Sequence, residues 1–305
     1  MTYLEQFRSA IILKLIIISF ISYAQVDFRL SVEERNMSKG EQISYMIDIP
    51  QADLKSVKKN WIKLLQEETK EKAIVTDHEI FIEGAIIKEI VQKPINVYSY
   101  VYEVDSIIRI YSFFEVDSVF FEYSGPENDI VGEKMYNGIT NFKRKFATEQ
   151  YIITVKDEME LEEKTLKILL GDLKKLEKEN ENLHKEIKEN EQHITESNEE
   201  LNMLDADNER QIKSISSQRE ELATISDSDQ KKIAKKELKN LENEKKKIGN
   251  KIEKEYKKIV EYQASITKCE SDIDKNLMLQ EEMKKEIETQ EALIKAVTAK
   301  LDGIK

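Results

Sequence analysis

Apolar residues recur at alternating spacings of three and four along most of the second half of the chain, and this pattern constrains the fold most. The first run, which we name the first seam, begins at Ile152 and ends at Ile225, and 15 of its 22 positions are apolar. Such spacing places apolar side chains along one stripe of a helix, and so many heptads predict a coiled coil. The first seam comprises Ile152, Val155, Met159, Glu162, Leu166, Leu169, Leu173, Leu176, Asn180, Leu183, Ile187, Asn190, Ile194, Ser197, Leu201, Leu204, Asn208, Gln211, Ile215, Gln218, Leu222 and Ile225.

A second seam begins at Ala234 and ends at Ile304, and 16 of its 21 positions are apolar. It is out of phase with the first seam, and the segment 226–229 (Ser-Asp-Ser-Asp) between them contains residue types that favour turns and helix caps. A continuous helix would rotate its apolar stripe at such a shift, whereas a turn would not. We therefore predict an antiparallel coiled-coil hairpin over residues 146–305, with its turn near 226–229 and arms of about 110 Å. The second seam comprises Ala234, Leu238, Leu241, Lys245, Ile248, Ile252, Glu255, Ile259, Tyr262, Ile266, Cys269, Ile273, Asn276, Gln280, Met283, Ile287, Gln290, Ile294, Val297, Leu301 and Ile304.

The turn segment also carries a candidate helix cap. Asp227 followed three residues later by Gln230 resembles a capping box, and Ser228 is the alternative cap. The pairing of the two arms is open, because one offset places Asn180 opposite Asn276 and a different offset suits other polar seam positions. Association of hairpins into a four-helix bundle is also compatible with the two seams.

Residues 25–145 differ in composition, since all three prolines precede residue 127 and most aromatic residues precede residue 152. Apolar and polar residues alternate at 26–32 and 43–49 around a turn at 36–41, which predicts two strands. After Pro50, apolar residues at helical spacing predict a helix over 54–65. Two strands, a helix, a further series of strands and a closing helix predict an α+β head with an antiparallel sheet and helices packed on one face. The later strands are expected at 73–75, 80–82, 85–90, 95–102, 107–114 and 119–123, with a tight turn at Glu83-Gly84.

Residues 1–24 have the pattern of a cleaved secretory signal peptide. Arg8 supplies a positive charge, residues 10–21 are almost wholly apolar, and 22–24 (Ser-Tyr-Ala) place small residues at a cleavage site. An uncleaved anchor is the alternative, but Lys14 interrupts the apolar run and leaves it shorter than the roughly 20 residues of a membrane span. The pattern predicts a periplasmic or secreted protein whose mature chain lacks a membrane span, and it is compatible with peripheral contact with the envelope.

The charge and the cysteine count exclude several classes of protein. With 60 Asp and Glu against 48 Lys and Arg, the chain has a formal net charge of -12, which opposes nucleic-acid binding because phosphates require a basic surface. A single cysteine excludes a disulfide framework and a multi-cysteine zinc or iron–sulfur site. The sequence contains no glycine-rich phosphate loop, nucleophile elbow or clustered acid pair, so it assigns no catalytic, cofactor-binding or metal-binding residue.

The histidines and the cysteine have structural interpretations. His78, His184 and His193 are the only histidines, and the last two flank the first seam without the i, i+4 spacing of zinc ligands on a helix. We therefore expect surface histidines. Cys269 occupies the second seam and is expected to be a buried structural thiol, since no histidine of the seam could activate it.

The stretch 142–146 (Phe-Lys-Arg-Lys-Phe) has two interpretations. It could contact an anionic membrane surface, but five residues are short for a helix that lies on a membrane. The interpretation we favour packs Phe142 and Phe146 on the sheet, with the three basic residues, Lys143 among them, facing water.

The later strands of the head are rich in aromatic residues. Tyr98, Tyr100 and Tyr102 alternate along the chain and therefore share one face of a strand. Two pairs of adjacent phenylalanines, at 113–114 and 120–121, must point to opposite faces, so some rings lie away from the core unless a helix covers that face too. An exposed aromatic face on a sheet is a candidate surface for a ligand or a partner.

Five short motifs are distinctive: 22–25 (Ser-Tyr-Ala-Gln), 36–40 (Asn-Met-Ser-Lys-Gly), 47–53 (Ile-Asp-Ile-Pro-Gln-Ala-Asp), 79–82 (Glu-Ile-Phe-Ile) and the opening of the coil at 173–187. Together they resemble a family of uncharacterised exported bacterial proteins. The resemblance covers most of the chain and implies a secreted α+β head with a C-terminal coiled coil. It implies no activity and transfers no functional residue.

Two classes of function remain. The first is a non-enzymatic exported scaffold or spacer of the cell envelope, which acts through its coiled coil by protein–protein contact or self-association. The second is an extracytoplasmic binding module whose aromatic-rich sheet captures a peptide, glycan or lipid, with the coil serving oligomerisation. Shortening the coil by whole heptads should disable a spacer and spare a binding module.

Overall fold

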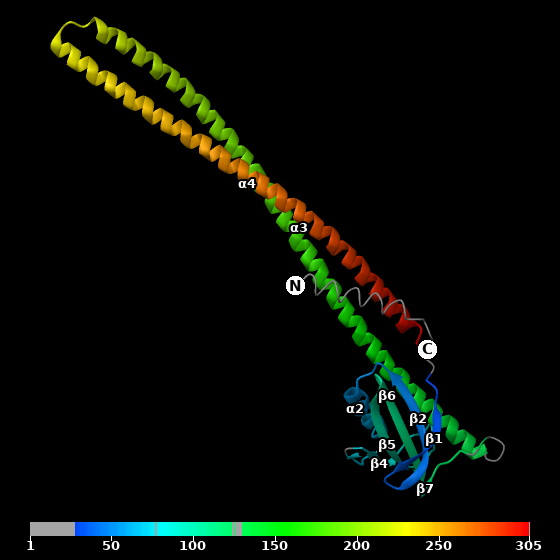
Figure 1. The fold of residues 1–305 in the computed structure, drawn as a ribbon. Helices are drawn as coiled ribbons and strands as arrows, with labels where there is room; N and C mark the ends of the chain where they lie inside the picture. Colours follow the sequence, from blue (N-terminus) through cyan, green and yellow to red (C-terminus); the bar gives the residue numbers. More distant parts are fainter. Residues whose placement is uncertain (1–27, 77, 124, 126–129, 305) are drawn as a thin grey trace. The chain divides into compact units, whose positions relative to one another are not determined.

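The computed structural model describes residues 28–76, 78–123, 125 and 130–304, and the predicted signal peptide at 1–24 lies outside these residues. A seven-stranded sheet is followed by two long helices that run side by side (Figure 1). This architecture confirms the predicted α+β head and antiparallel helical hairpin. The elements are β1 (Ser31–Met37), β2 (Gly40–Pro50), α2 (Leu54–Leu65), β3 (Ile74–Val75), β4 (Ile80–Ala85), β5 (Ile95–Val104), β6 (Ile107–Val116), β7 (Val119–Phe120), α3 (Ile130–Thr224) and α4 (Ser228–Asp302).

The sheet has the strand order β1-β2-β6-β5-β4-β3, and β7 pairs with the end of β6. All of these pairings are antiparallel, as predicted. β5 and β6 form the central hairpin, in which Ser99 lies opposite Ser112, and Tyr45 of β2 lies opposite Ser112 on the other side. Because side chains alternate between the two faces of a strand, these registers decide which residues enter the core.

The strand boundaries differ from the predicted ones at several places, and β7 ends at Phe120 although the predicted strand runs to residue 123. Pairing of β1 begins at Ser31, later than the alternation at 26–32 suggested. The predicted turn at Glu83-Gly84 is wrong, because β4 continues through it as a bulge in which Gly84 takes a φ of +62°. The predicted strand at 85–90 is wrong beyond Ala85, since the amides of Ile90 and Val91 both donate to the carbonyl of Ile87 in a tight turn.

The main hydrophobic core lies between one face of the sheet, α2 and the first part of α3. Trp61 of α2 is fully buried, and its ring centroid lies 5.7 Å from that of Phe142 and 4.9 Å from that of Phe146. The prediction that both phenylalanines pack on the core is therefore confirmed. Asp53 caps α2, because its carboxylate accepts a hydrogen bond from the Ser56 amide at 2.8 Å.

Helix α3 begins within the head and passes residue 145, the predicted domain boundary, without a break. The compact unit that holds the sheet includes α3 up to Leu166 and α4 from Thr289 onward, and a second unit comprises Lys167–Glu288. Near the start of α3, Gly138 lies against the loop that follows β4. A Cβ at Gly138 would lie 2.1 Å from the carbonyl oxygen of Glu89, so this close approach requires glycine.

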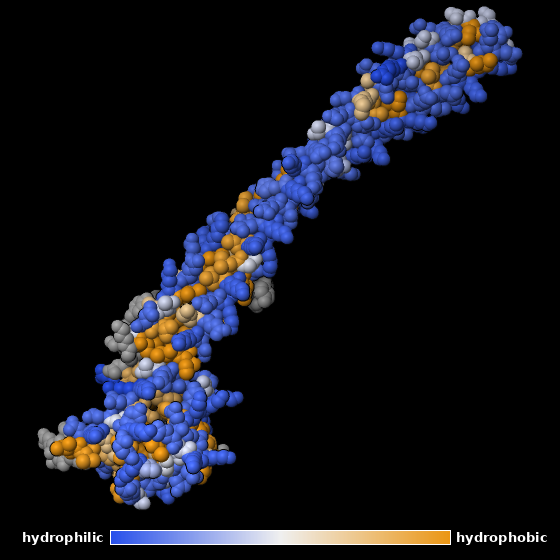
Figure 2. Space-filling model, turned by 180° about the vertical axis from the view of Figure 1, so that it is seen from behind, coloured by the Kyte–Doolittle hydropathy of each residue, from blue (hydrophilic) through white to orange (hydrophobic). Residues whose placement is uncertain are grey.

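The two seams face each other in the hairpin. Every position of the first seam is buried or half-buried, and among the second-seam positions, all of which the structure describes, only Lys245 is exposed. On the face drawn in Figure 2, hydrophilic residues cover most of the visible surface of the long helices, and apolar residues form separate patches. The apolar residues of the two seams are thus largely buried against each other within one chain.

Contacts within the 167–288 unit follow one register from the turn onward. Asn190 donates to Ser265 Oγ at 3.1 Å, and the rings of His193 and Tyr262 stack with centroids 5.1 Å apart. Asn276 donates to Glu179 Oε2 at 3.4 Å. The sequence left two offsets open, and this register agrees with the one in which residues 180 and 276 face each other.

The turn of the hairpin lies at residues 225–227, within two residues of the predicted position at 226–229. The Asp227 carboxylate accepts hydrogen bonds from the backbone amides of Asp229 at 3.0 Å and Gln230 at 2.8 Å. These two amides open α4 and have no partner within the helix, so the side chain satisfies them. Asp227 is therefore the cap rather than Ser228.

Cys269 is buried in the seam, as predicted, close to Glu186 of α3. Burial raises the pKa of its thiol, and the neighbouring carboxylate of Glu186 raises it further. Because this thiol faces α3 of its own chain, we expect the purified protein to run as a monomer on a non-reducing gel after exposure to air. A disulfide-linked dimer would instead indicate parallel pairing between chains and would contradict the hairpin.

Candidate functional site

The second face of the sheet carries a separate cluster of aromatic and methionine side chains, which we name the aromatic face. In the described part of the chain, every member comes from a strand and none from a helix. Tyr98, Tyr100, Tyr111 and Phe113 are buried, and the others are half-buried. The complete set is Met37, Met46, Phe81, Tyr98, Tyr100, Tyr102, Tyr111, Phe113 and Phe120.

Strand alternation places these residues as predicted. Tyr98, Tyr100 and Tyr102 lie together on the aromatic face. The two adjacent phenylalanine pairs are split, since residues 113 and 120 belong to the aromatic face while residues 114 and 121 pack in or against the main core. The sheet therefore has an apolar layer on both sides, and the described helices contribute to only one of them.

The rings of the aromatic face pack against one another. Phe81 stacks on Tyr98 with centroids 4.5 Å apart, and Tyr100 meets the edge of Phe113 at 5.8 Å. These are favourable offset and edge-to-face geometries. The face is therefore a continuous platform of rings whose half-buried members, Phe81, Tyr102 and Phe120, keep surface that a ligand could contact.

Carboxylates at the margin of the platform accept hydrogen bonds from its tyrosines. The hydroxyl of Tyr98 donates to Glu115 at 3.1 Å, and that of Tyr100 donates to Glu79 at 2.9 Å. Burial and then the adjacent carboxylate raise the pKa of each phenol to about 12. Both tyrosines are therefore neutral hydrogen-bond donors at physiological pH, and neither has the character of a catalytic base.

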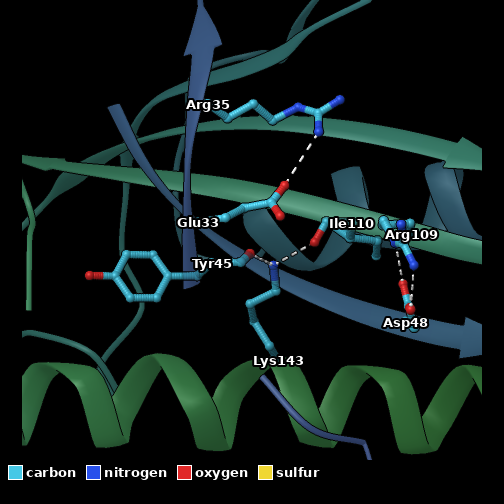
Figure 3. A network of polar contacts seen from close by, with 7 residues as sticks. All are labelled: Glu33, Arg35, Tyr45, Asp48, Arg109, Ile110 and Lys143. Carbon is cyan, nitrogen blue, oxygen red and sulfur yellow. Dashed lines mark hydrogen bonds and ion pairs between the residues drawn. The ribbon is translucent and has the colours of Figure 1, made fainter. Parts of the chain in front are cut away.

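Two arginines, Arg35 and Arg109, lie beside Tyr102 and Tyr111 at another margin of the same face. Arg109 forms a two-pronged ion pair with Asp48, with N–O distances of 2.7 and 2.8 Å (Figure 3). The guanidinium of Arg35 lies 3.9 Å from the ring centroid of Tyr111 and also contacts Glu33 at 3.4 Å. Stacked rings beside paired charges are suited to binding a ligand through its flat apolar surface and its hydrogen-bonding groups.

Lys143 contradicts the prediction that it faces water. Its side chain is fully buried, and its ammonium donates to the carbonyl oxygens of Tyr45 and Ile110 and to Ser112 Oγ, the last two at 2.9 Å (Figure 3). Position 143 lies on the same side of α3 as Phe142 and Phe146, so packing of those rings carries the lysine inward. Arg144 and Lys145 are exposed, as predicted.

The contact between Lys143 and Ser112 has the distance of a base–nucleophile pair. Both side chains are wholly inaccessible, however, because Ser112 and Lys143 each have an exposure of 0%. A substrate would have to enter the packed core to reach the hydroxyl. The pair is therefore part of the core rather than a catalytic site.

The histidines and the other potential metal ligands are dispersed over the described residues. His78, His184 and His193 are exposed, as predicted, and His193 contacts Glu196 and Tyr262. Within the described ranges, no three His, Cys, Asp or Glu side chains form a cluster that could hold a metal ion. The candidate surface is therefore the aromatic face.

A small pocket lies between the start of α2 and α3. Its volume is about 230 Å³, and its lining includes Gln51, Asp53, Ser56, Gln150 and Asp157. Drug-sized ligands generally occupy about 300–1,000 Å³. Since Asp53 is already engaged as the helix cap, the pocket offers few groups for a ligand.

The chain matches no protein-family profile, no curated protein and no solved structure. None of the described helices is both long and apolar enough to cross a membrane. The hairpin and the aromatic face are therefore the features of the described residues that bear on function.

Proposed function

We propose that the protein is a non-enzymatic exported scaffold or spacer of the cell envelope, whose hairpin acts by protein–protein contact. The observation that carries this proposal is that the two seams are buried against each other within one chain. An isolated amphipathic helix must pair to bury its stripe, but here α3 and α4 bury each other's stripes within one chain. Such a hairpin can hold a fixed length without depending on oligomerisation.

The surface of the hairpin fits the same role. Its outer positions are rich in ion pairs between neighbouring turns, such as Lys257 with Glu253 at 2.7 Å and Lys284 with Glu281 at 2.9 Å. Exposed pairs of this kind add little stability, but they keep a long helix soluble. Export is supported by the signal pattern at 1–24, which would place the scaffold in the periplasm or outside the cell.

A binding module is the second candidate, and the aromatic face favours it. Its half-buried rings and its marginal carboxylates could receive a peptide, a glycan or a lipid. The two candidates differ in which part of the chain carries the function: the length of the hairpin for a spacer, and the aromatic face for a binding module.

Shortening both arms of the hairpin in register tests the spacer. Deleting 198–204 from α3 together with 251–257 from α4 removes one heptad from each arm and shortens it by about 10 Å. The register pairs these two segments, so we expect a stable, helical protein. In cells that lack the native gene, we expect the shortened protein to be made at normal levels and to fail to restore the wild-type phenotype.

Two variants control this experiment. Deletion of 198–204 alone leaves α4 one heptad too long and is expected to lower the melting temperature, which shows that register matters. Tyr102→Ala combined with Phe120→Ala leaves the hairpin intact and should restore the phenotype if the protein is a spacer. Full function of the shortened protein, with loss of function in the aromatic-face variant, would favour the binding module instead.

A further inference from the structure

The amine of Lys143 is buried in the core, and it projects from α3 toward the gap between β2 and β6 (Figure 3). Its three acceptors are the carbonyl oxygens of Tyr45 and Ile110 and the hydroxyl of Ser112. In the described residues no carboxylate contacts it, so a charge on this amine is solvated only by dipoles and by the ring of Trp61, whose centroid lies 5.6 Å away.

The contacts of Lys143 suit both of its protonation states. A protonated amine has three N–H donors, and the site offers three acceptors. A neutral amine can keep two donations to the carbonyls and accept the third hydrogen bond from the Ser112 hydroxyl, which can donate as well as accept. The two states therefore differ mainly in the cost of removing the charge from water.

The elements around Lys143 contribute little other charge. β2 supplies Tyr45, whose phenol donates to the carbonyl of Phe121 at 3.3 Å and whose pKa is raised by burial. β6 supplies Ser112 and α2 supplies Trp61, and neither side chain titrates. On α3 the neighbouring basic residues, Arg144 and Lys145, are exposed. Lys143 is thus the group whose charge changes within this part of the core.

We propose that Lys143 is a proton-operated latch: loss of its proton tightens the packing of α3 on the sheet, and uptake of a proton loosens it. The latch stands on the position of the amine, which bridges two strands from a helix that carries much of the core. It sets how firmly the first part of α3 is held against β2 and β6. It is independent of whether the protein is a spacer or a binding module.

The direction of the pH effect follows from burial. Desolvation holds the pKa of Lys143 well below its usual range, whereas the same side chain in the unfolded chain has a pKa of about 10.4. Between these two values the unfolded chain binds a proton that the folded head does not bind. Stability therefore rises with pH through this window, by up to about tenfold in the folding equilibrium constant per pH unit, and is lost as the pH falls.

The test uses urea unfolding of the full chain, followed by the fluorescence of Trp61, the only tryptophan. Between about pH 7 and pH 9.5, we expect the folding equilibrium constant of the wild type to rise relative to that of Lys143→Met, by up to about tenfold per pH unit. The tyrosines of the aromatic face with a raised pKa titrate above this range. Lys145→Met, an exposed neighbour on the same helix, should retain the wild-type slope.

Lys143→Gln is a second variant for the case in which Lys143→Met does not fold, because glutamine is neutral and keeps two N–H donors for the carbonyls. The folding equilibrium constant of the wild type should rise with pH relative to that of Lys143→Gln, as it does relative to that of Lys143→Met. Parallel pH profiles of the wild type and the Lys143 variants would overturn the latch. Loss of the slope in Lys145→Met would also overturn it, because the effect would then come from general surface charge.

Discussion

Gly138→Ala is expected to destabilise the head by about 3 kcal/mol. The added Cβ would lie 2.1 Å from the carbonyl oxygen of Glu89 and 2.9 Å from the Cα of Ile90. Both are backbone atoms, so no side-chain rotation relieves the clash, and either α3 or the loop after β4 must move. Urea unfolding followed by Trp61 fluorescence measures the loss, because Trp61 reports on the core that α3 covers.

Gly171→Ala is the matched control on the same helix. A Cβ added at Gly171 would meet no atom of the described residues within 4 Å, and α3 is helical there. Alanine should therefore raise the stability of the hairpin by about 1 kcal/mol, the ordinary helix-propensity gain. Thermal unfolding followed by circular dichroism measures this gain. Equal effects of the two substitutions would contradict the close approach at Gly138.

Trp61→Ala is expected to cost about 3–5 kcal/mol, the range for removal of a large aromatic side chain from a core. Trp61 is fully buried and packs against Phe142 and Phe146, so its loss leaves a cavity between α2 and α3. Amide hydrogen exchange of β5 and β6 measures the effect without the lost fluorophore. We expect these central strands to exchange on global opening and therefore much faster in the variant.

Trp61→Phe is the informative comparison. The indole Nε1 of Trp61 has no hydrogen-bond partner among the residues that the structure describes. Replacement by phenylalanine therefore reduces the side-chain volume in the core but breaks no hydrogen bond of the indole. We expect a loss well below that of alanine, about 1–2 kcal/mol. A phenylalanine variant as unstable as the alanine variant would show that the indole nitrogen contributes and that cavity formation is not the main cost.

The periodic parts of the fold were predictable because their signal is local and repeated. The seams predicted the hairpin, since each heptad independently marks the same stripe, and the phase shift located the turn near Asp227. The alternation of Tyr98, Tyr100 and Tyr102 likewise predicted a shared face. Neither inference required knowledge of a distant contact.

The sequence-based predictions were wrong where a contact with a distant part of the chain decides the local structure. Gly84 permits either a turn or a bulge, and the pairing of β4 with β5 selects the bulge. The charge of Lys143 predicts an exposed side chain, although this residue follows Ile139 by four positions and precedes Phe146 by three, which is the spacing of the buried stripe. The carbonyls that receive its ammonium come from strands about 30 and 100 residues away in the sequence, where local pattern carries no information.

The single register of the hairpin has a consequence for how such a chain can diverge. An insertion in one arm displaces the contacts between the arms on one side of it, toward either the turn or the head, whereas a compensating insertion in the facing arm restores them. Asn190 and Ser265 illustrate the separation, since they are in contact although they are 75 positions apart in the sequence. The lengths of the two arms should therefore change together. Related hairpins should carry insertions and deletions in pairs, one in each arm, at sites far apart in the sequence.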